Sequence, residues 1–166
     1  FQNIRLFKKL TVLENVKVAM NRTMKYSVAQ ALLRGGRYWA EEKETDARAR
    51  ALLRMVHLEE KAAYVAENLP YGQQRRLEIA RALATGMKVL LLDEPAAGMN
   101  PTETAELLDI INDIRSQFHI SVLLIEHDMS LVMKICERIQ VIDYGVTIAS
   151  GTPEEIANHP RVIEAY

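Results

Sequence analysis

The sequence predicts an α/β fold whose core is a parallel sheet. Two runs of branched apolar residues, Val89 to Leu92 and Ile120 to Ile125, have the composition of strands buried on both faces. A helical stretch from Pro101 to Phe118 separates them, and such a strand–helix–strand unit makes its strands parallel neighbours. Charged residues follow both runs, as Asp93-Glu94 and Glu126-His127. Open α/β sheets bind their ligands at this end of the strands.

The composition indicates one domain with a real core. The chain has 166 residues, of which 49% are hydrophobic. Its net charge is -1 and its charges are mixed along the chain, so we expect no nucleic-acid partner. The single cysteine, Cys136, excludes an internal disulfide. No apolar run approaches the roughly 20 residues of a membrane span, so we expect any membrane link to come through a partner.

The N-terminal part is predicted to be helical. Thr11 and Glu14 fit a capping box, and residues from about 11 to 67 read as helices and connectors without a convincing strand. Gly35-Gly36 marks a turn. The basic and aromatic residues Arg34, Arg37, Tyr38 and Trp39 are interpreted as a solvated helix end rather than a nucleic-acid contact.

The segment from Asn68 to Pro101 organises the rest of the chain. Tyr71-Gly72 is predicted to open a helix, Gln73 to Thr85 are good helix formers, and Gly86 is placed to end it. After the first strand, Asn100 can cap the next helix, with Pro101 first and Glu103 third.

The C-terminal part combines a helix, a hairpin and a last short helix. Asp128 can cap a helix from about Met129 to Glu137. Ile139–Asp143 and Val146–Ala149 flank Tyr144-Gly145, and this pattern predicts a hairpin turn. The sequence from Gly151 to Glu155 then supplies a cap, a proline and a glutamate for the final helix.

Several motifs resemble those of ABC-transporter ATPases. Leu69 to Gln73 resembles the signature, VLLLDEP resembles the Walker B strand with its catalytic glutamate, and Ala97 to Asn100 resembles the D-loop. His127 in LLIEHDM is similar to the switch histidine, and Gln2 stands where the Q-loop glutamine would be. The motifs occur in family order and at family spacing. The resemblance implies a P-loop NTPase-like fold with a helical subdomain and a C-terminal hairpin and helix.

The resemblance also implies roles for these residues in the hydrolysis of ATP with Mg²⁺. Asp93 and Gln2 would hold the Mg²⁺ shell, Glu94 would polarise the attacking water, and His127 would hydrogen-bond the γ-phosphate. ATP bound to the opposite subunit of a head-to-tail dimer would contact the following residues: Leu69, Pro70, Tyr71, Gly72, Gln73 and Asn100. The partner subunit can be a second copy or a related chain.

Three departures from the family pattern stand out. No G-x-x-x-x-G-K-[ST] occurs, so we expect a fragment that lacks its N-terminal portion and that binds Mg-ATP poorly and is inactive as it stands. Pro70 stands where the signature usually has serine, which removes a hydroxyl and an amide donor. Asn100 replaces the commoner D-loop aspartate, which removes a charge and keeps hydrogen bonding.

Among subfamilies the resemblance is strongest to the ATPase of branched-chain amino acid importers, on the evidence of YGQQRRLEIARAL, DEPAAGMNP and LLIEHDM. A lipopolysaccharide-export ATPase and a non-catalytic, permease-binding remnant remain as alternatives. The resemblance divides the chain into a Q-loop segment (1–10), a helical subdomain ending in the signature (11–72) and a part of the catalytic core (73–166). It implies a peripheral protein at the cytoplasmic face of the inner membrane, where the helical subdomain contacts the permease.

Overall fold

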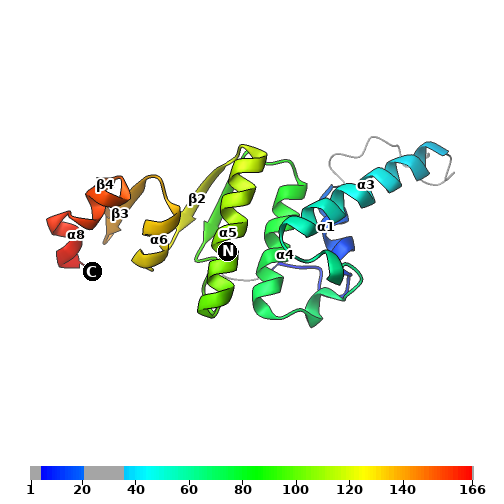
Figure 1. Ribbon diagram of the computed structural model, residues 1–166, viewed down its shortest axis with the longest axis horizontal. Coiled ribbons are helices and arrows are strands. Elements are labelled where there is room, and N and C mark those ends of the chain that lie inside the picture. The colour runs from blue at the N-terminus through cyan, green and yellow to red at the C-terminus, as the bar shows by residue number, and fades with distance from the viewer. Residues whose placement is uncertain (1–4, 21–35, 166) are drawn as a thin grey trace. The chain divides into compact units, whose positions relative to one another are not determined.

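The computed structural model describes residues 5–20 and 36–165 (Figure 1). Gln2, Arg34 and Gly35 therefore lie outside the described residues. The chain divides into two compact units, Phe1–Leu124 and Ile125–Tyr166, and each is described by itself.

The first unit contains the predicted helical part. Its helices are α1 (Val12–Met20), α3 (Gly36–Met55), η2 (Glu59–Lys61), η3 (Ala66–Asn68), α4 (Tyr71–Ala84) and α5 (Pro101–Phe118), where η marks 3₁₀ turns. An isolated antiparallel bridge joins Thr11 to Val65. Gly36 begins α3, and Trp39 in its first turns is exposed, as a solvated helix end requires.

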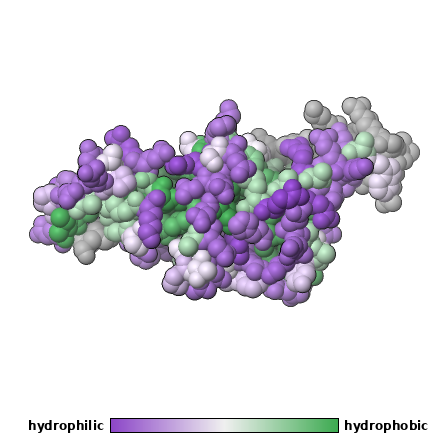
Figure 2. Space-filling model, in the orientation of Figure 1, coloured by the Kyte–Doolittle hydropathy of each residue, from purple (hydrophilic) through white to green (hydrophobic). Residues whose placement is uncertain are grey.

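Helices α1, α3 and α4 pack against one another (Figure 1). Apolar residues at helical spacing on each of them are buried: Val12, Val16, Ala49, Leu53, Leu77 and Ala80. The visible face of α3 is mostly hydrophilic (Figure 2), so this helix turns an apolar stripe inward and a polar face outward. The spacing of Leu107, Ile110, Ile111, Ile114 and Phe118 predicts one apolar face on α5. The first four are buried, whereas Phe118 at the end of the helix is 40% exposed.

The strand–helix–strand unit is present as predicted. Strands β1 (Val89–Asp93) and β2 (Ser121–Ile125) are hydrogen-bonded neighbours in a parallel sheet, and α5 connects them. The N–H of Ser121 donates to the C=O of Lys88 at 3.0 Å.

The expectation that both faces of these strands are buried is wrong for the described structure. Leu90 is 4% exposed, whereas Val89 and Leu91 are 54% and 64% exposed. Leu123 and Ile125 of β2 are exposed to a similar degree. Successive strand residues point to opposite faces, so one face of the sheet is covered and the other is open.

The predicted helix boundaries are largely confirmed. Side-chain and backbone groups of Thr11 and Glu14 exchange hydrogen bonds of 2.7 to 3.2 Å at the start of α1. Asn100 and Glu103 form a capping box at α5, where Pro101 occupies the first turn. Gly86 follows α4 with φ of 70°, the left-handed conformation that ends many helices.

The second unit is built on a hairpin. Its elements are α6 (Met129–Ile135), β3 (Ile139–Asp143), β4 (Val146–Gly151), α7 (Pro153–Ala157) and α8 (Pro160–Ala165). β3 and β4 pair antiparallel, and Tyr144 and Gly145 both have positive φ, as a tight primed turn requires. A small core holds the unit together, formed by Val132, Ile139, Val141, Ala149, Ile156 and Val162.

Asp128 caps α6 as predicted, but this helix ends at Ile135, two residues earlier than expected. Thr152 and Glu155 form the predicted capping box of α7. Across residues 5–20 and 36–165, no helix has the length and apolar character needed to cross a membrane.

Candidate functional site

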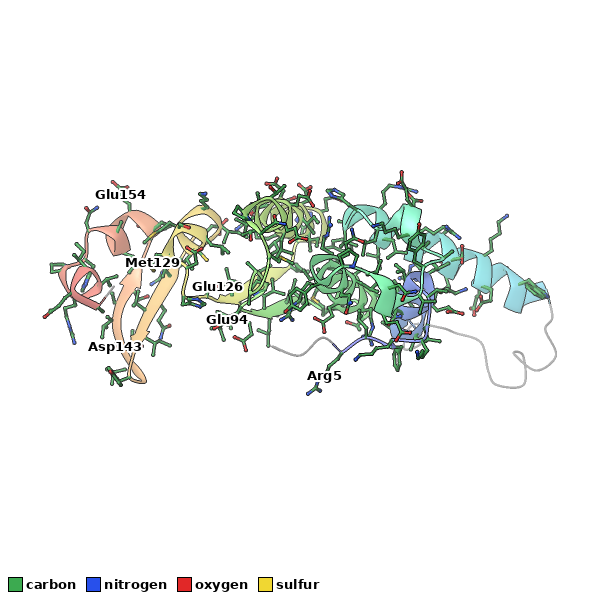
Figure 3. The ribbon with its side chains drawn as sticks, turned by 90° about the horizontal axis from the view of Figure 1, so that it is seen from below. Arg5, Glu94, Glu126, Met129, Asp143 and Glu154 are labelled. Carbon is green, nitrogen blue, oxygen red and sulfur yellow. The ribbon has the colours of Figure 1, made fainter. Side chains whose placement is uncertain are left out.

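The first part of the candidate site lies where β1 ends. Asp93 is the last residue of the strand. Glu94, labelled in Figure 3, follows it and has φ of 42°, in the left-handed region. The C=O of Glu94 accepts a hydrogen bond from the N–H of Ala97 at 3.1 Å, which closes a turn. Both carboxylate residues are half-buried, and Pro95 behind them is buried. The backbone thus changes direction between two adjacent acids.

The D-loop segment, Ala97–Asn100, continues from this turn into α5. Gly98 has φ of 76°, and the N–H of Met99 donates to the C=O of Ala96 at 3.1 Å. The Asn100 side chain accepts from the N–H of Glu103 at 3.0 Å, and the Glu103 carboxylate accepts from the N–H of Asn100 at 3.1 Å. The side-chain oxygen of Asn100 is therefore already engaged in capping α5.

The signature turn, Leu69–Gln73, leads into α4. Leu69 is buried, and Pro70 occupies the N-cap position of the helix without a side-chain capping bond. The Gln73 side chain accepts a hydrogen bond from Lys61 Nζ at 2.8 Å. Gln74 Nε2 donates to the C=O of Leu69 at 2.8 Å, which ties the turn to the first turn of the helix. The first N–H groups of a helix have no partner within the helix, and together with the helix dipole they make its start a positive end that favours anions.

The structure brings the signature turn and the D-loop segment together. A Cβ on Gly72 would lie 3.0 Å from Glu103 Oε1 and 3.5 Å from Met99 Cε. A Cβ on Gly98 would lie 3.6 Å from Tyr71 Cε1. Gly72 therefore permits a close approach of two segments that are distant in the sequence, whereas a Cβ at Gly98 would make an ordinary van der Waals contact.

His127 belongs to the second unit. Its side chain is 75% exposed, and its Nδ1 lies 4.0 Å from Oε2 of Glu126, whose side chain is only 4% exposed. Asp128 Oδ1 accepts from Ser130 Oγ at 2.7 Å and from the Ser130 N–H at 2.9 Å. The Ser130 hydroxyl and the backbone N–H groups of Ser130 and Leu131 lower the pKa of Asp128.

Sequence reasoning did not single out several charged residues near these segments. Arg75, on α4, is 7% exposed and pairs with Glu78 at 3.2 Å, and its Nε donates to the Tyr71 hydroxyl at 3.2 Å. For Glu126, the sequence indicates only a charged residue after the second strand and gives it no role. In the sequence, these residues look like ordinary charged residues on a helix or at a strand end. The neighbouring residues do not indicate that their side chains are buried.

A cavity of about 660 Å³ borders the open side of β1 within the first unit. Its walls come from β1, from α1 and α4, and from the segment that contains Arg5 and Phe7. Asp93 lines it, together with apolar side chains of the strand such as Val89 and Leu91.

Among the residues that the structure describes, no cluster of three or more His, Cys, Asp or Glu side chains is placed to hold a metal. Mg²⁺ in nucleotide sites, however, takes only one or two protein carboxylates and completes its shell with phosphates and waters. The single carboxylate of Asp93 at a strand end therefore fits a nucleotide-bound Mg²⁺ and does not fit a metal held by the protein alone.

Two family models match the chain. The ABC transporter model matches residues 1–97, and the branched-chain amino acid ATP-binding cassette transporter model matches residues 146–166. A curated relative, the high-affinity branched-chain amino acid transport ATP-binding protein LivG of Salmonella typhimurium, is 48% identical over 166 residues. That match covers all of this chain and 65% of LivG. The chain thus spans just under two thirds of the length of this relative.

Solved structures agree in fold. The ADP conformation of MJ1267, an ATP-binding cassette of an ABC transporter, matches with a TM-score of 0.75 at 28% identity, over 96% of this chain and 63% of that one. The dimeric MJ0796, a bacterial ABC transporter cassette, matches with a TM-score of 0.72 at 25% identity, over 92% of this chain and 61% of that one. These matches confirm the predicted fold class.

Proposed function

Because the chain belongs to the ABC transporter family, we propose that it is part of an ATP-hydrolysing subunit of an importer for branched-chain amino acids. The 48% identity to LivG over the whole chain and the second family model at residues 146–166 support this cargo. The second model also favours the importer over the lipopolysaccharide-export alternative.

The proposed chemistry rests on one observation: two adjacent acids lie where β1 ends, and the second of them, Glu94, has a left-handed backbone at the start of the turn. Asp93 ends the strand, so its side chain follows the strand's alternation, whereas Glu94 belongs to the turn. The two carboxylates can therefore serve different partners. We assign Asp93 to the metal and Glu94 to the water that attacks the γ-phosphate.

Mg²⁺ would be held by Asp93, with Gln2 as a second ligand from outside the described residues. When bound, the ion neutralises charge on the phosphates and orients them. Glu94 would accept a hydrogen bond from the attacking water and polarise it toward the phosphorus. His127 would donate to the γ-phosphate, and its high exposure leaves its ring accessible to a ligand.

The signature turn would bind the phosphates of ATP held by a partner subunit. Its donors are the first N–H groups of α4, reinforced by the helix dipole. Pro70 has no N–H, and the Gln73 side chain is already bonded to Lys61, so the later amides of the first turn have the main role. Asn100 would contribute from the D-loop segment, which packs against the signature turn through Gly72 and Gly98.

The proposed partners are a second ATPase subunit in head-to-tail orientation and a membrane permease. The dimeric form of the related MJ0796 cassette supports the first partner. Residues 11–72 would form the helical subdomain that contacts the permease, between the Q-loop segment (1–10) and the catalytic part (73–166). This arrangement would place the protein at the cytoplasmic face of the membrane as a peripheral subunit, with no nucleic-acid partner.

The test is steady-state ATP hydrolysis by the complete gene product that carries these residues. Glu94→Gln should lower kcat by two orders of magnitude or more while Mg-ATP binding is kept, because only the water-orienting group is lost. The matched control is Asp113→Asn, the same kind of change at an exposed acid of α5. Hydrolysis by the Glu94→Gln variant at the level of the control would refute the role of Glu94. Branched-chain amino acid uptake that does not depend on this gene would refute the cargo.

A further inference from the structure

Two side chains of α4 form hydrogen bonds to the backbone of Arg5, one to its N–H and one to its C=O. The N–H of Arg5 donates to Glu78 Oε1 at 2.7 Å, and Arg81 Nη1 donates to the C=O of Arg5. The Arg5 side chain points away from α4 (Figure 3), so these contacts depend on its main chain. We call this pair of contacts the Arg5 clamp. Glu78 and Arg81 are 73 and 76 residues from Arg5 in the sequence.

The Arg5 clamp is connected to the signature turn. Glu78 Oε2 pairs with Arg75 Nη1 at 3.2 Å, and Arg75 Nε donates to the Tyr71 hydroxyl at 3.2 Å. The Arg75 guanidinium also lies 5.5 Å from the centre of the Tyr71 ring. Because Arg75 is 7% exposed, its bonds are shielded from water and hold their geometry better than surface ion pairs. A continuous polar chain therefore runs from Tyr71 to the backbone of Arg5.

The next residues are fixed as well. The Phe7 ring lies 4.9 Å from the Arg81 guanidinium carbon. The backbone of Phe7 exchanges two 3.0 Å hydrogen bonds with the side chain of Asn15, which is fully buried on α1. The segment from Arg5 to Phe7 is thus held by α4 on one side and by α1 on the other.

We propose that Glu78 and Arg81 are positioning residues for ATP hydrolysis, because they hold the segment from Arg5 to Phe7 in register with the signature turn. The inference rests on the function proposed above. The clamp fixes both the N–H and the C=O of Arg5, and Glu78 passes the contact on through Arg75 to Tyr71 of the signature turn. A change at Glu78 or Arg81 should therefore shift the signature turn.

The kinetic test compares variants of the complete gene product. Glu78→Ala and Arg81→Met should each lower kcat about tenfold with KM for Mg-ATP changed less than about twofold, because neither residue is assigned to the nucleotide. Glu78→Gln should recover to within about threefold of wild type, since its amide oxygen still accepts from the Arg5 N–H. The double variant should be about as slow as either single one, rather than a hundredfold slower, because both residues act on one backbone unit.

The matched control is Glu106→Ala on α5. It removes the 3.1 Å ion pair to Arg76, which is on α4 like Glu78, and it leaves the contacts of Arg5 unchanged. It should keep kcat within about twofold of wild type, because the Glu106 side chain is 46% exposed and ion pairs that reach solvent contribute little. A fall in kcat as large as that of Glu78→Ala would show that α4 is merely sensitive to charge loss, which overturns the proposal.

Hydrogen exchange tests the clamp separately from the chemistry. Glu78→Ala should speed exchange of the Arg5 amide about tenfold or more, and Glu106→Ala should not. Faster exchange with an unchanged kcat overturns the positioning role. Unchanged exchange overturns the clamp itself. If the wild-type product hydrolyses no ATP, the proposed function fails and the positioning role with it, and the exchange rates still decide whether the clamp exists.

Discussion

Gly72 on α4 and Glu103 on α5 approach so closely that a Cβ on Gly72 would lie 3.0 Å from Glu103 Oε1. The same carboxylate completes the capping box of α5 by accepting from the N–H of Asn100. An alanine at position 72 must therefore either displace Glu103 or shift the signature turn.

The effect of Gly72→Ala on stability should depend on Glu103. Alanine favours a helix over glycine by up to about 1 kcal/mol, so Gly72→Ala should stabilise a Glu103→Ala background. In the wild-type background the displaced cap should cancel that gain or reverse it, with a coupling free energy of at least about 0.5 kcal/mol. Chemical denaturation of the four proteins measures it. Equal effects in both backgrounds would show that the contact is energetically irrelevant.

Asp93→Asn should weaken Mg²⁺-dependent nucleotide binding, in contrast to Glu94→Gln. The change removes the charge of the carboxylate that we assign to the metal, and hydrogen bonds and contacts to charged groups are worth roughly 1.5–3 kcal/mol. We expect a roughly tenfold to hundredfold loss of affinity for Mg-ATP in calorimetric titration. Nucleotide binding without Mg²⁺ should change little, and an equal loss in both conditions would contradict the metal role.

Pro70→Ser should change ATP hydrolysis only a few-fold. Pro70 is the N-cap of α4 without a side-chain bond, and serine there can cap the helix and donate one more amide and a hydroxyl to a phosphate. A single such contact is worth only about 1 kcal/mol. A hundredfold or larger gain in kcat would show that proline impairs this signature.

The Asp128 cap should make stability depend on pH. The Ser130 hydroxyl and the amides of Ser130 and Leu131 depress the folded-state pKa of Asp128. A depressed pKa contributes stability that is present above the unfolded pKa of about 3.9 and is lost as pH falls through the folded value. The stability lost in Asp128→Ala, relative to wild type, should therefore shrink below about pH 4. Asp128→Asn keeps an uncharged cap, so its own stability should lack this pH-dependent contribution.

The hairpin turn offers a stabilising change. Tyr144 is fully exposed and has φ of 43°, a conformation that asparagine tolerates better than an aromatic residue. Tyr144→Asn should slow hydrogen exchange of the β3–β4 amides a few-fold, whereas Gly145→Ala should speed it, because Gly145 has φ of 79°. Faster exchange in Tyr144→Asn would show that the ring contributes packing.

The features that the sequence predicted best are local. The capping pairs Thr11–Glu14, Asn100–Glu103 and Thr152–Glu155 each depend on residues three apart, and all three form as expected. The hairpin at Tyr144-Gly145 and the helix end at Gly86 depend likewise on backbone chemistry that residue types reveal.

The features that could not be predicted depend on partners far away in the chain. An apolar run such as Val89–Leu92 shows that a strand has two apolar faces but not which face the rest of the described structure covers. The contact between Glu78 and Arg5 joins residues 73 positions apart, and neither has a signal in its own neighbourhood. The left-handed backbone of Glu94 is also invisible in the sequence, since glutamate rarely adopts it.

The backbone of Glu94 has a consequence for directed evolution of this protein. A left-handed conformation costs an L-residue with a Cβ roughly 1–2 kcal/mol, and glycine adopts it almost without cost. At φ of 42°, Glu94→Gly should therefore raise thermal tolerance while it removes the carboxylate on which the proposed hydrolysis depends. A library of variants selected for heat resistance alone would accumulate this substitution and lose ATP hydrolysis. Any such selection must therefore also screen for ATP hydrolysis.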